Sequence, residues 1–175
     1  MTTDEFKNKV IPVKDKIFRL ARRILNNAED AEDIVQEVFL KMWSKNIDIS
    51  SLKNADAFMM TVAKNLCLDK IRSNGHQMIE VNEWNVPLSA AAPDTMLELK
   101  DEVSGVERII RSLPLMQQMI VQMRDIEGLE YEEMEEILNI NANAIRVNLS
   151  RARKTIREQL IKKHDYEYQG SKNIG

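Results

Sequence analysis

The sequence predicts an all-α protein of two small helical domains joined by a flexible linker, with a helix–turn–helix in the C-terminal domain. Only five glycines and four prolines occur among 175 residues, and residues that favour helices dominate. Apolar residues recur at intervals of three and four, the spacing of one helix face. The stretch Pro87–Pro93 interrupts this pattern. We therefore assign residues 1–75 and 94–163 to the domains, 76–93 to the linker and 164–175 to a tail.

Three amphipathic segments make up the predicted N-terminal domain. The first follows Pro12 and ends at Asn26–Asn27, and the second opens near Ala28 with acidic residues that suit the positive end of a helix. A loop at Lys45–Asn54 precedes the third, which stops at Ser73–Gly75. Their apolar faces are Ile17, Leu20, Ala21 and Ile24; Ile34, Val35, Val38, Phe39 and Met42, closed by Trp43; and Phe58, Val62, Leu66 and Ile71.

The C-terminal domain is predicted to begin with a helix from about Asp94 to Ile110. Ser112–Pro114 then restarts a helix, with the serine as its cap and the proline in its first turn. This helix continues to Gly128. Two shorter helical patterns follow, Tyr131–Leu138 and a segment from about Asn143 past Leu160.

The four-residue turn Asn139–Ala142 between these two patterns has the spacing of a helix–turn–helix. Asn139 stands where glycine is common, and asparagine tolerates a left-handed backbone. A helical projection of the second segment predicts a buried stripe of Ile145, Leu149, Ala152, Ile156 and Leu160. The remaining surface carries Arg146, Val147, Asn148, Ser150, Arg151, Arg153, Lys154 and Arg157. Arginine and asparagine can bind base edges in the major groove, and lysine suits phosphates, so this surface predicts DNA binding.

Charge is distributed unevenly along the chain, whose net charge is −3. Residues 1–74 carry 13 basic and 11 acidic side chains, residues 75–136 carry 4 and 14, and residues 137–175 carry 8 and 3. A binding partner responds to local potential, so the basic C-terminal segment remains compatible with DNA. The acidic run between Glu127 and Glu136 is expected to point away from the DNA.

Nothing in the sequence indicates catalysis. His76 and His164 lie in a loop and a tail, Cys67 lacks a partner nearby, and no metal-ligand spacing, phosphate loop or nucleophile motif occurs. We expect no cofactor, no metal and no small-molecule substrate. A single cysteine, no signal peptide and no apolar run of membrane-spanning length predict a cytoplasmic protein.

Two segments of the N-terminal domain resemble region 2 of bacterial RNA polymerase sigma factors of the sigma-70 family. Asp30–Trp43 contains the pattern DAED-x-x-Q-x-x-F, similar to the polymerase-binding segment, and Ala57–Arg72 resembles the segment that handles the minus-ten promoter element. Ser112–Pro114 and Asn143–Arg153 resemble region 4. The order, spacing and length are similar to the extracytoplasmic-function group. The sequence departs from the usual helix–turn–helix of this family at two places. It has Met134–Glu135 where Ile-Ala is usual, and Asn139 where glycine is usual.

This resemblance implies a role for each surface. It implies that Asp30, Asp33, Gln36, Glu37, Phe39 and Leu40 bind core RNA polymerase, with Phe39 largely in the core and Trp43 as a packing residue. It implies that Lys64, Asn65, Asp69 and Arg72 contact the minus-ten element, and that the basic helix reads the minus-thirty-five element of promoter DNA. It further implies an anti-sigma factor, often anchored in the membrane, that covers both domains. The free protein is expected to be compact, held in part by the acidic middle of the chain and the basic C-terminal helix.

Two other functions fit the residues alone. A helix–turn–helix regulator that is not a polymerase subunit would need the DNA-binding surface but not the DAED segment. A purely structural helical adaptor would need neither DNA nor polymerase.

Overall fold

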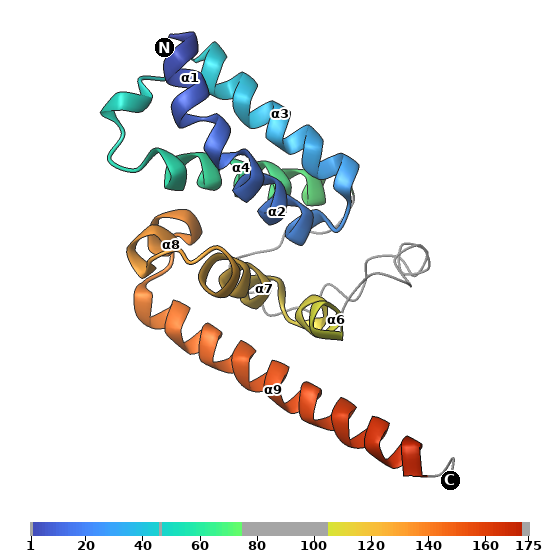
Figure 1. Ribbon diagram of the computed structural model, residues 1–175. Helices are drawn as coiled ribbons and strands as arrows, with labels where there is room; N and C mark the ends of the chain where they lie inside the picture. The colour runs from blue at the N-terminus through green and yellow to red at the C-terminus, as the bar shows by residue number, and fades with distance from the viewer. Residues whose placement is uncertain (1, 46, 75–104, 173–175) are drawn as a thin grey trace.

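The computed structural model describes residues 2–45, 47–74 and 105–172, and the side chains of Ser50, Ser171 and Lys172 are left undescribed. Every regular element in these ranges is a helix, which confirms the all-α fold (Figure 1). The predicted linker 76–93 and the predicted helical residues 94–104 lie outside them. We refer to residues 2–74 as the N-terminal half and to residues 105–172 as the C-terminal half.

The N-terminal half contains α1 (Thr3–Lys9), α2 (Lys14–Leu25), α3 (Ala28–Ser44) and α4 (Ala55–Ser73), with 3₁₀ turns at Ile11–Val13 and Ile49–Ser51. Local chemistry sets the helix ends. Asn26 ends α2 in the left-handed conformation, at φ 53°, and the Asn27 side chain caps α3 by accepting a 2.9 Å bond from the backbone nitrogen of Asp30. The three helices predicted here are confirmed, with the loop between α3 and α4 as expected.

Helix α1 was not predicted from the sequence. Its seven residues carry no apolar repeat, and it begins with a capping box in which Thr2 and Glu5 bond each other's backbone nitrogens. Phe6 anchors it, with its ring edge-to-face against Phe39 at 5.6 Å and Trp43 at 5.7 Å between centroids. Helix α1 therefore packs on α3, a helix that follows later in the sequence.

The C-terminal half contains α6 (Gly105–Ser112), α7 (Leu115–Val121), the π-helix η4 (Gln122–Ile126), α8 (Tyr131–Leu138) and α9 (Ala142–Lys172). The restart at Ser112–Pro114 is confirmed, but the predicted cap is wrong. The Ser112 hydroxyl donates to the carbonyl of Ile109 at 2.6 Å, and Pro114 occupies the cap position of α7 without a side-chain bond. Gln118 instead binds this corner, donating to the carbonyls of Arg111 and Leu113.

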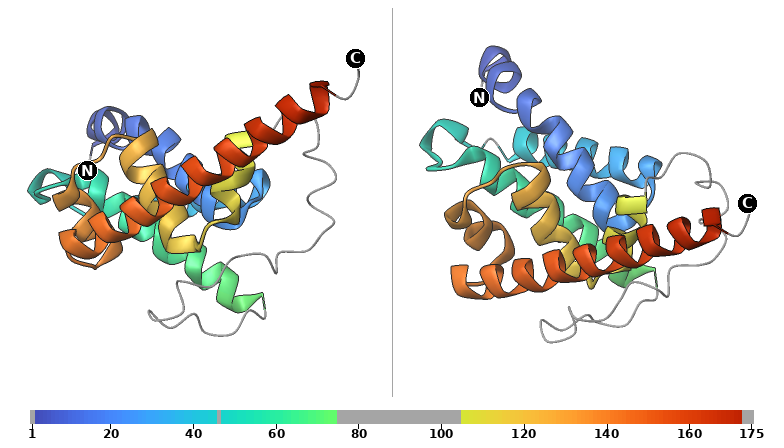
Figure 2. Two further views of the ribbon diagram at one scale, coloured as in Figure 1. Left: turned by 90° about the horizontal axis from the view of Figure 1, so that it is seen from below. Right: turned by 60° about the horizontal axis from the view of Figure 1, so that its bottom comes forward.

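The two halves pack against each other in this structure. Helix α4 lies against α8, and α2 lies against α7 and η4 (Figure 2). The buried apolar side chains of both halves form one continuous core. The compact arrangement expected for the free protein is therefore the one observed.

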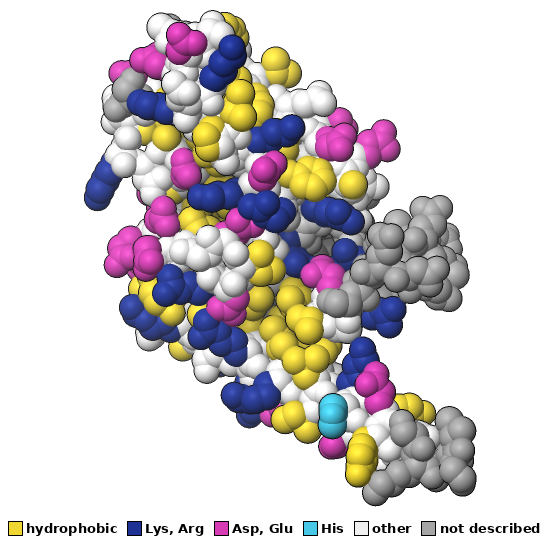
Figure 3. Space-filling model, viewed as in Figure 1, with side chains coloured by type: hydrophobic (Ala, Val, Ile, Leu, Met, Phe, Trp, Pro, Cys, Tyr) yellow, Lys and Arg dark blue, Asp and Glu magenta, His cyan; other side chains and the backbone are white. Residues whose placement is uncertain are grey.

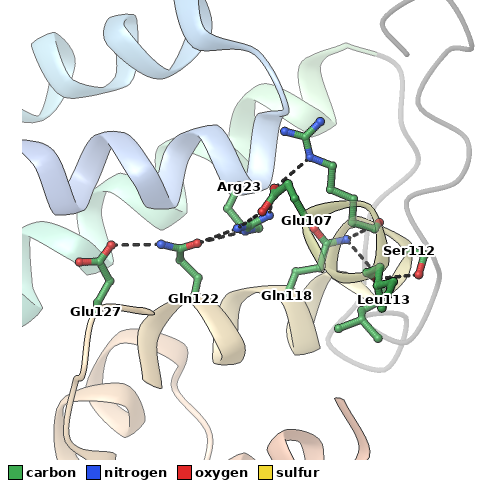
Figure 4. A network of polar contacts seen from close by, with 9 residues as sticks. Arg23, Glu107, Ser112, Leu113, Gln118, Gln122 and Glu127 are labelled. Carbon is green, nitrogen blue, oxygen red and sulfur yellow. Dashed lines mark hydrogen bonds and ion pairs between the residues drawn. The ribbon is translucent and has the colours of Figure 1, made fainter. Parts of the chain in front are cut away.

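A polar network joins the halves around the π-helix, and we call it the interface network: Arg19, Arg23, Glu107, Gln122 and Glu127. Figure 4 shows its part from Arg23 and Glu107 through Gln122 to Glu127. The Arg23 guanidinium donates two bonds to the Glu107 carboxylate and also bonds the Gln122 amide oxygen at 3.0 Å. The Gln122 amide donates to Glu127 at 3.0 Å, and Arg19 completes a second two-bond pair with Glu127 at 2.6 and 2.9 Å. The basic partners come from α2, whereas the expected partner was the basic C-terminal helix.

Helix α9 extends well past the body of the protein (Figure 1). Its first turns are buried as predicted, but Leu160 is 36% exposed and Ile161 56%, so the predicted stripe ends before Leu160. The helix continues through the predicted tail to Lys172. Of the helices described, none is both long and apolar enough to cross a membrane.

Candidate nucleic-acid interface

The turn between α8 and α9 is fixed by hydrogen bonds at both ends. Asn139 adopts the left-handed conformation, at φ 54°, and its backbone nitrogen bonds the carbonyl of Glu135 at 2.9 Å, as the sequence predicts. The Asn141 side chain caps α9 by accepting from the backbone nitrogen of Ala144 at 2.8 Å. The Glu135 carboxylate accepts from the backbone nitrogen of Ala142. These bonds fix the angle between the two helices of the motif.

One side of α9 is buried against the rest of the C-terminal half. Ile145 and Ala152 are fully buried and Leu149 is 2% exposed, as the helical projection predicts. Met134 and Ile137 of α8 are also fully buried. Helix α9 is therefore held in one rotation about its axis, and its opposite side faces solvent.

The exposed side of α9 carries most of the residues predicted to contact DNA. Arg146, Val147, Ser150, Arg151, Lys154 and Arg157 are all exposed. Lysine and arginine side chains gather over the first half of α9 (Figure 3). A single helix with one buried and one basic side has the dimensions that enter a major groove.

Three predicted DNA contacts have polar partners within the protein, of which Lys154 forms a 3.9 Å ion pair with Glu158 on the exposed side of α9. Arg153 forms an ion pair with Asp125 of η4, and the hydrogen bond from Asp125 raises the pKa of Arg153. Asn148 is half-buried, and its amide donates to the carbonyl of Ala144 at 2.9 Å. Arg153 and Asn148 must leave those partners before they can contact DNA.

Tyr131 lies between two arginines at the start of α8. The Arg146 guanidinium carbon is 4.6 Å from the centre of its ring, and that of Arg124 is 4.8 Å away. Arg124 is held in turn by the carbonyl of Leu129, at 2.6 Å. Such cation–π contacts orient Arg146 before any ligand binds. Neither Tyr131 nor Arg124 was predicted as a site residue, although their position beside the motif and the scarcity of aromatic residues are visible in the sequence.

A pocket of about 230 Å³ opens in the N-terminal half between the end of α3, the following loop and α4. Asn65 and Asp69 line it together with Phe58 and Lys45. Arg72 lies one turn further along α4 and forms a 3.3 Å ion pair with Asp69. The structure therefore brings Asn65, Asp69 and Arg72 together at the surface predicted to contact the minus-ten element.

Lys64 does not join that surface. Lys64 is not among the described residues that line the pocket. Lys64 is only 6% exposed, and it has no hydrogen bond or ion pair with any described residue. Burial lowers the pKa of its ammonium group. The contact of Lys64 with the minus-ten element stays a prediction, and in this conformation the side chain is buried.

The predicted polymerase-binding residues lie along α3. Asp33, Gln36 and Glu37 are exposed, and Leu40 is 67% exposed. Asp30 forms a 2.6 Å ion pair with Lys70 of α4, which raises the pKa of Lys70. Phe39 is half-buried against Phe6, whereas Trp43, predicted as a packing residue, remains 54% exposed beside the same ring. Exposed Leu40 and Trp43 give this acidic surface an apolar component.

Comparison with known protein families identifies the family to which these two helical halves belong. Residues 12–77 match the family model of sigma-70 region 2, and residues 105–156 match that of sigma-70 region 4. The chain belongs to the sigma-70 family, in its extracytoplasmic-function group. The first match covers the N-terminal half except α1, and the second covers the C-terminal half except the last part of α9.

Relatives of this sigma factor share its two regions at low identity. It is 28% identical over 151 residues to the ECF RNA polymerase sigma factor SigE of Mycolicibacterium smegmatis, covering 85% of this chain and 58% of that protein. It is 29% identical over 170 residues to the ECF RNA polymerase sigma factor SigW of Bacillus subtilis, covering 90% and 89%. The chain thus spans little more than half of the first relative and most of the second.

A solved structure has the same fold. The sigma factor RpoE from Bartonella quintana, in complex with the anti-sigma factor NepR, superposes with a TM-score of 0.69 at 20% identity. The alignment covers 90% of this chain and 98% of RpoE.

The departures from the usual motif have physical explanations in this sigma factor. Met134 is fully buried and fills the apolar position of α8. Glu135, where alanine is usual, accepts the backbone nitrogen of Ala142 at the start of α9. Asn139 adopts the conformation that the usual glycine would provide. The helix–turn–helix geometry is therefore retained.

Proposed function

We propose that the protein binds core RNA polymerase and directs it to specific promoters, through contacts with the minus-thirty-five and minus-ten elements. It acts by binding rather than by catalysis, and it works in the cytoplasm, where polymerase and chromosome meet. The observation that carries the proposal is the fixed rotation of α9, which buries Ile145 and Leu149 and leaves Arg146, Ser150 and Arg151 exposed on one side.

Helix α9 is the reader of the minus-thirty-five element. Arg146, Ser150 and Arg151 lie near its N-terminal end, which is the part of a recognition helix that contacts base edges. Val147, 40% exposed on the same side, can contact a thymine methyl group. Lys154 and Arg157 lie further along the helix and suit phosphates, as Arg153 does once it leaves Asp125.

The pocket beside α4 receives a base of the minus-ten element. Opening a promoter requires bases to leave the stack, and a protein that holds such a base needs a pocket with polar groups for its edge. Asn65 and Asp69 supply those groups, and Phe58 supplies an aromatic surface. Lys45 and Arg72 add positive charge for the phosphates nearby.

The exposed side of α3 is the contact surface for core polymerase. Asp33, Gln36 and Glu37 provide charge and hydrogen-bonding groups, and Leu40 and Trp43 provide apolar area. Protein interfaces combine such an apolar centre with a polar rim.

The compact arrangement cannot contact both promoter elements at once. Their centres are about 25 base pairs apart, or roughly 85 Å along B-DNA, whereas α9 with its 31 residues is about 46 Å long. Thirty residues separate Asn74 from Gly105, enough chain to span roughly 100 Å when extended. The two halves must therefore separate on the promoter, and an anti-sigma factor that keeps them together would block initiation.

Run-off transcription with core polymerase and genomic DNA fragments tests the proposal. We expect discrete transcripts that require the protein, and we expect Arg146→Ala with Arg151→Ala to abolish them without changing the circular dichroism spectrum. A control changes the exposed Lys162 of α9 to alanine, which should leave transcription unchanged. Transcripts of equal strength with and without the protein would contradict a role as a sigma factor.

A further inference from the structure

Lys64 is a charged side chain that is buried without a charged partner among the described residues. It is 6% exposed, whereas the other lysines described are half-buried or fully exposed. Burying an ammonium group without a counter-charge is costly, and proteins normally pair such groups or leave them in water. The conformation observed here therefore carries an unfavourable contribution at Lys64.

The position of Lys64 on α4 places it where the two halves meet. Asp56 marks the side of α4 that faces α2, because it pairs with Lys16 at 3.3 Å. Asn54 marks the side that faces α8, because its amide donates to Glu133 at 2.9 Å. At about 100° per residue, Lys64 points roughly midway between these two directions. Leu68, one turn further along, is likewise buried, at 6% exposed.

Charged groups on the surrounding helices are engaged elsewhere. On α2, Lys16 pairs with Asp56, Arg19 with Glu127 and Arg23 with Glu107. On α8, Glu133 accepts from Asn54 and from the backbone nitrogen of Glu130, Glu135 accepts from Ala142, and Glu132 and Glu136 are exposed. On α3, Asp30 pairs with Lys70. No described carboxylate forms an ion pair with Lys64.

Two opposing contributions therefore act on the same interface. The interface network favours the packed halves through two-bond arginine–carboxylate pairs, which are among the stronger polar contacts in proteins. Burial of the Lys64 charge disfavours the packed halves. Because α4 packs against α8 on this side, we expect separation of the halves to return Lys64 to solvent on the helix that also carries Asn65 and Asp69.

We propose that Lys64 sets the balance between the packed and separated halves: it weakens the packed state that the interface network stabilises, so that the protein can open when polymerase and DNA bind. The benefit of opening for promoter contact rests on the proposed function. The conformational balance itself is a property of the free protein. Removing the Lys64 charge should shift the free protein toward the packed state, and removing Arg23 should shift it toward the separated state.

Distance measurements between two labels in the full chain test this balance. Glu32→Cys on α3 and Gln159→Cys on α9 provide exposed sites in the two halves, and the native Cys67 is fully buried and stays in place. Electron–electron resonance distances are measured in four proteins: the unaltered chain, Lys64→Met, Arg23→Ala and the double variant. We expect Arg23→Ala to populate longer distances and the added Lys64→Met to restore the short ones, with the ratio of packed to separated molecules rising at least about tenfold.

Two control variants separate charge from packing. Lys64→Arg retains the charge and should not restore the short distance in the Arg23→Ala protein. Lys53→Met removes an exposed lysine on the loop before α4 and should leave every distance unchanged. Long distances that persist in the Lys64→Met, Arg23→Ala double variant would overturn the proposal, as would an unchanged distance in Arg23→Ala alone. Failure of the proposed function would appear in run-off transcription and would leave these distances unaffected.

Discussion

Arg23 of α2 and Glu107 of α6, 84 residues apart in the chain, form a two-bond ion pair that joins the N- and C-terminal halves. The Arg23 side chain is 8% exposed and that of Glu107 27%, so the pair is shielded from solvent more than a surface pair would be. Glu107 also accepts from Arg111 at 3.1 Å. The carboxylate thus lies between two guanidinium groups.

This geometry predicts that acid separates the halves. Desolvation raises the pKa of Glu107, but the hydrogen bonds and charges of Arg23 and Arg111 outweigh it, so the pKa is lowered overall. Glu127 behaves in the same way, with Arg19 and Gln122 as the partners that outweigh desolvation. A carboxylate with a lowered pKa stabilises the packed state fully above its ordinary pKa of about 4.3, and the contribution is lost as the pH falls through the lowered value.

We therefore expect the labelled protein to shift toward long distances as the pH falls below about 4.3. A Glu107→Gln variant should show a smaller shift over the same range, because one titrating group is gone. Far-ultraviolet circular dichroism at each pH separates opening from unfolding. An identical pH profile in the variant would exclude Glu107 as a source of the effect.

Arg146 and Lys154 should differ in how they affect DNA binding. Arg146→Ala should weaken binding to the cognate minus-thirty-five element by about 1–3 kcal/mol, with a smaller loss on scrambled DNA, because a two-bond contact to guanine is specific. Lys154→Ala should weaken both DNAs alike and flatten the salt dependence of binding. Fluorescence anisotropy over a salt series measures both. Equal losses on both DNAs for the two variants would contradict the assigned roles.

Tyr131 is expected to act on DNA binding through Arg146. Tyr131→Ala removes the ring that orients the guanidinium, and a cation–π contact of this exposure contributes about 0.5–1 kcal/mol, or roughly a two- to fivefold loss of affinity. Tyr131→Phe retains the ring and should bind almost as well as the unaltered protein. Tyr166→Ala, on the projecting end of α9 and 79% exposed, is a matched control. If Tyr131→Ala weakens binding equally in an Arg146→Ala protein, the ring does not act through Arg146.

Asn65 should be needed for promoter opening but not for polymerase binding. Asn65→Ala removes a polar group from the pocket beside α4, and its exposed position means that folding should be unaffected. Permanganate reactivity of the melted strand measures opening, and a pull-down with core enzyme measures binding. Undiminished permanganate reactivity would remove Asn65 from the proposed minus-ten surface.

The α3 surface is tested by changing Asp33 and Gln36 to alanine together. Both side chains are exposed, so each change should alter the free energy of unfolding by less than about 0.5 kcal/mol while weakening the pull-down of core polymerase. Lys7→Ala with Asn8→Ala on α1 is a control of equal size on another exposed surface. A double variant that is retained by core enzyme as strongly as the control would show that the contact lies elsewhere.

The sequence predicted α8, the turn and α9 well because local signals agreed. Apolar spacing defined both helices, and Asn139 offered the left-handed residue that the turn requires. Helix α1 was missed because Phe6 is its one large apolar contact and the partner rings of that contact belong to α3. A seven-residue helix of this kind depends on tertiary packing more than on its own sequence.

The site was predicted less evenly than the fold. Exposure of Arg146, Ser150 and Arg151 followed from the helical projection, whereas Lys64 is buried on a helix that packs against both α2 and α8, elements outside its own segment of the chain. The partners of Arg153 and Arg146 likewise lie on other elements, η4 and α8. A projection of one helix assigns its sides correctly but does not identify the element that covers each side.

The π-helix η4 has a consequence for insertions and deletions. Its wide turn, seen in the bond from the Glu127 nitrogen to the Gln122 carbonyl, holds one residue more than an α-helical turn would. Removal of a single residue between Gln122 and Glu127 would restore ordinary α-helical spacing and, because the wide turn holds that one extra residue, would leave the segments on either side in nearly the same orientation. Insertion of a further residue there would instead rotate everything downstream by about 100° and take Asp125 and Glu127 out of register with Arg153 and Arg19. This five-residue segment should therefore tolerate the loss of one residue better than the gain of one.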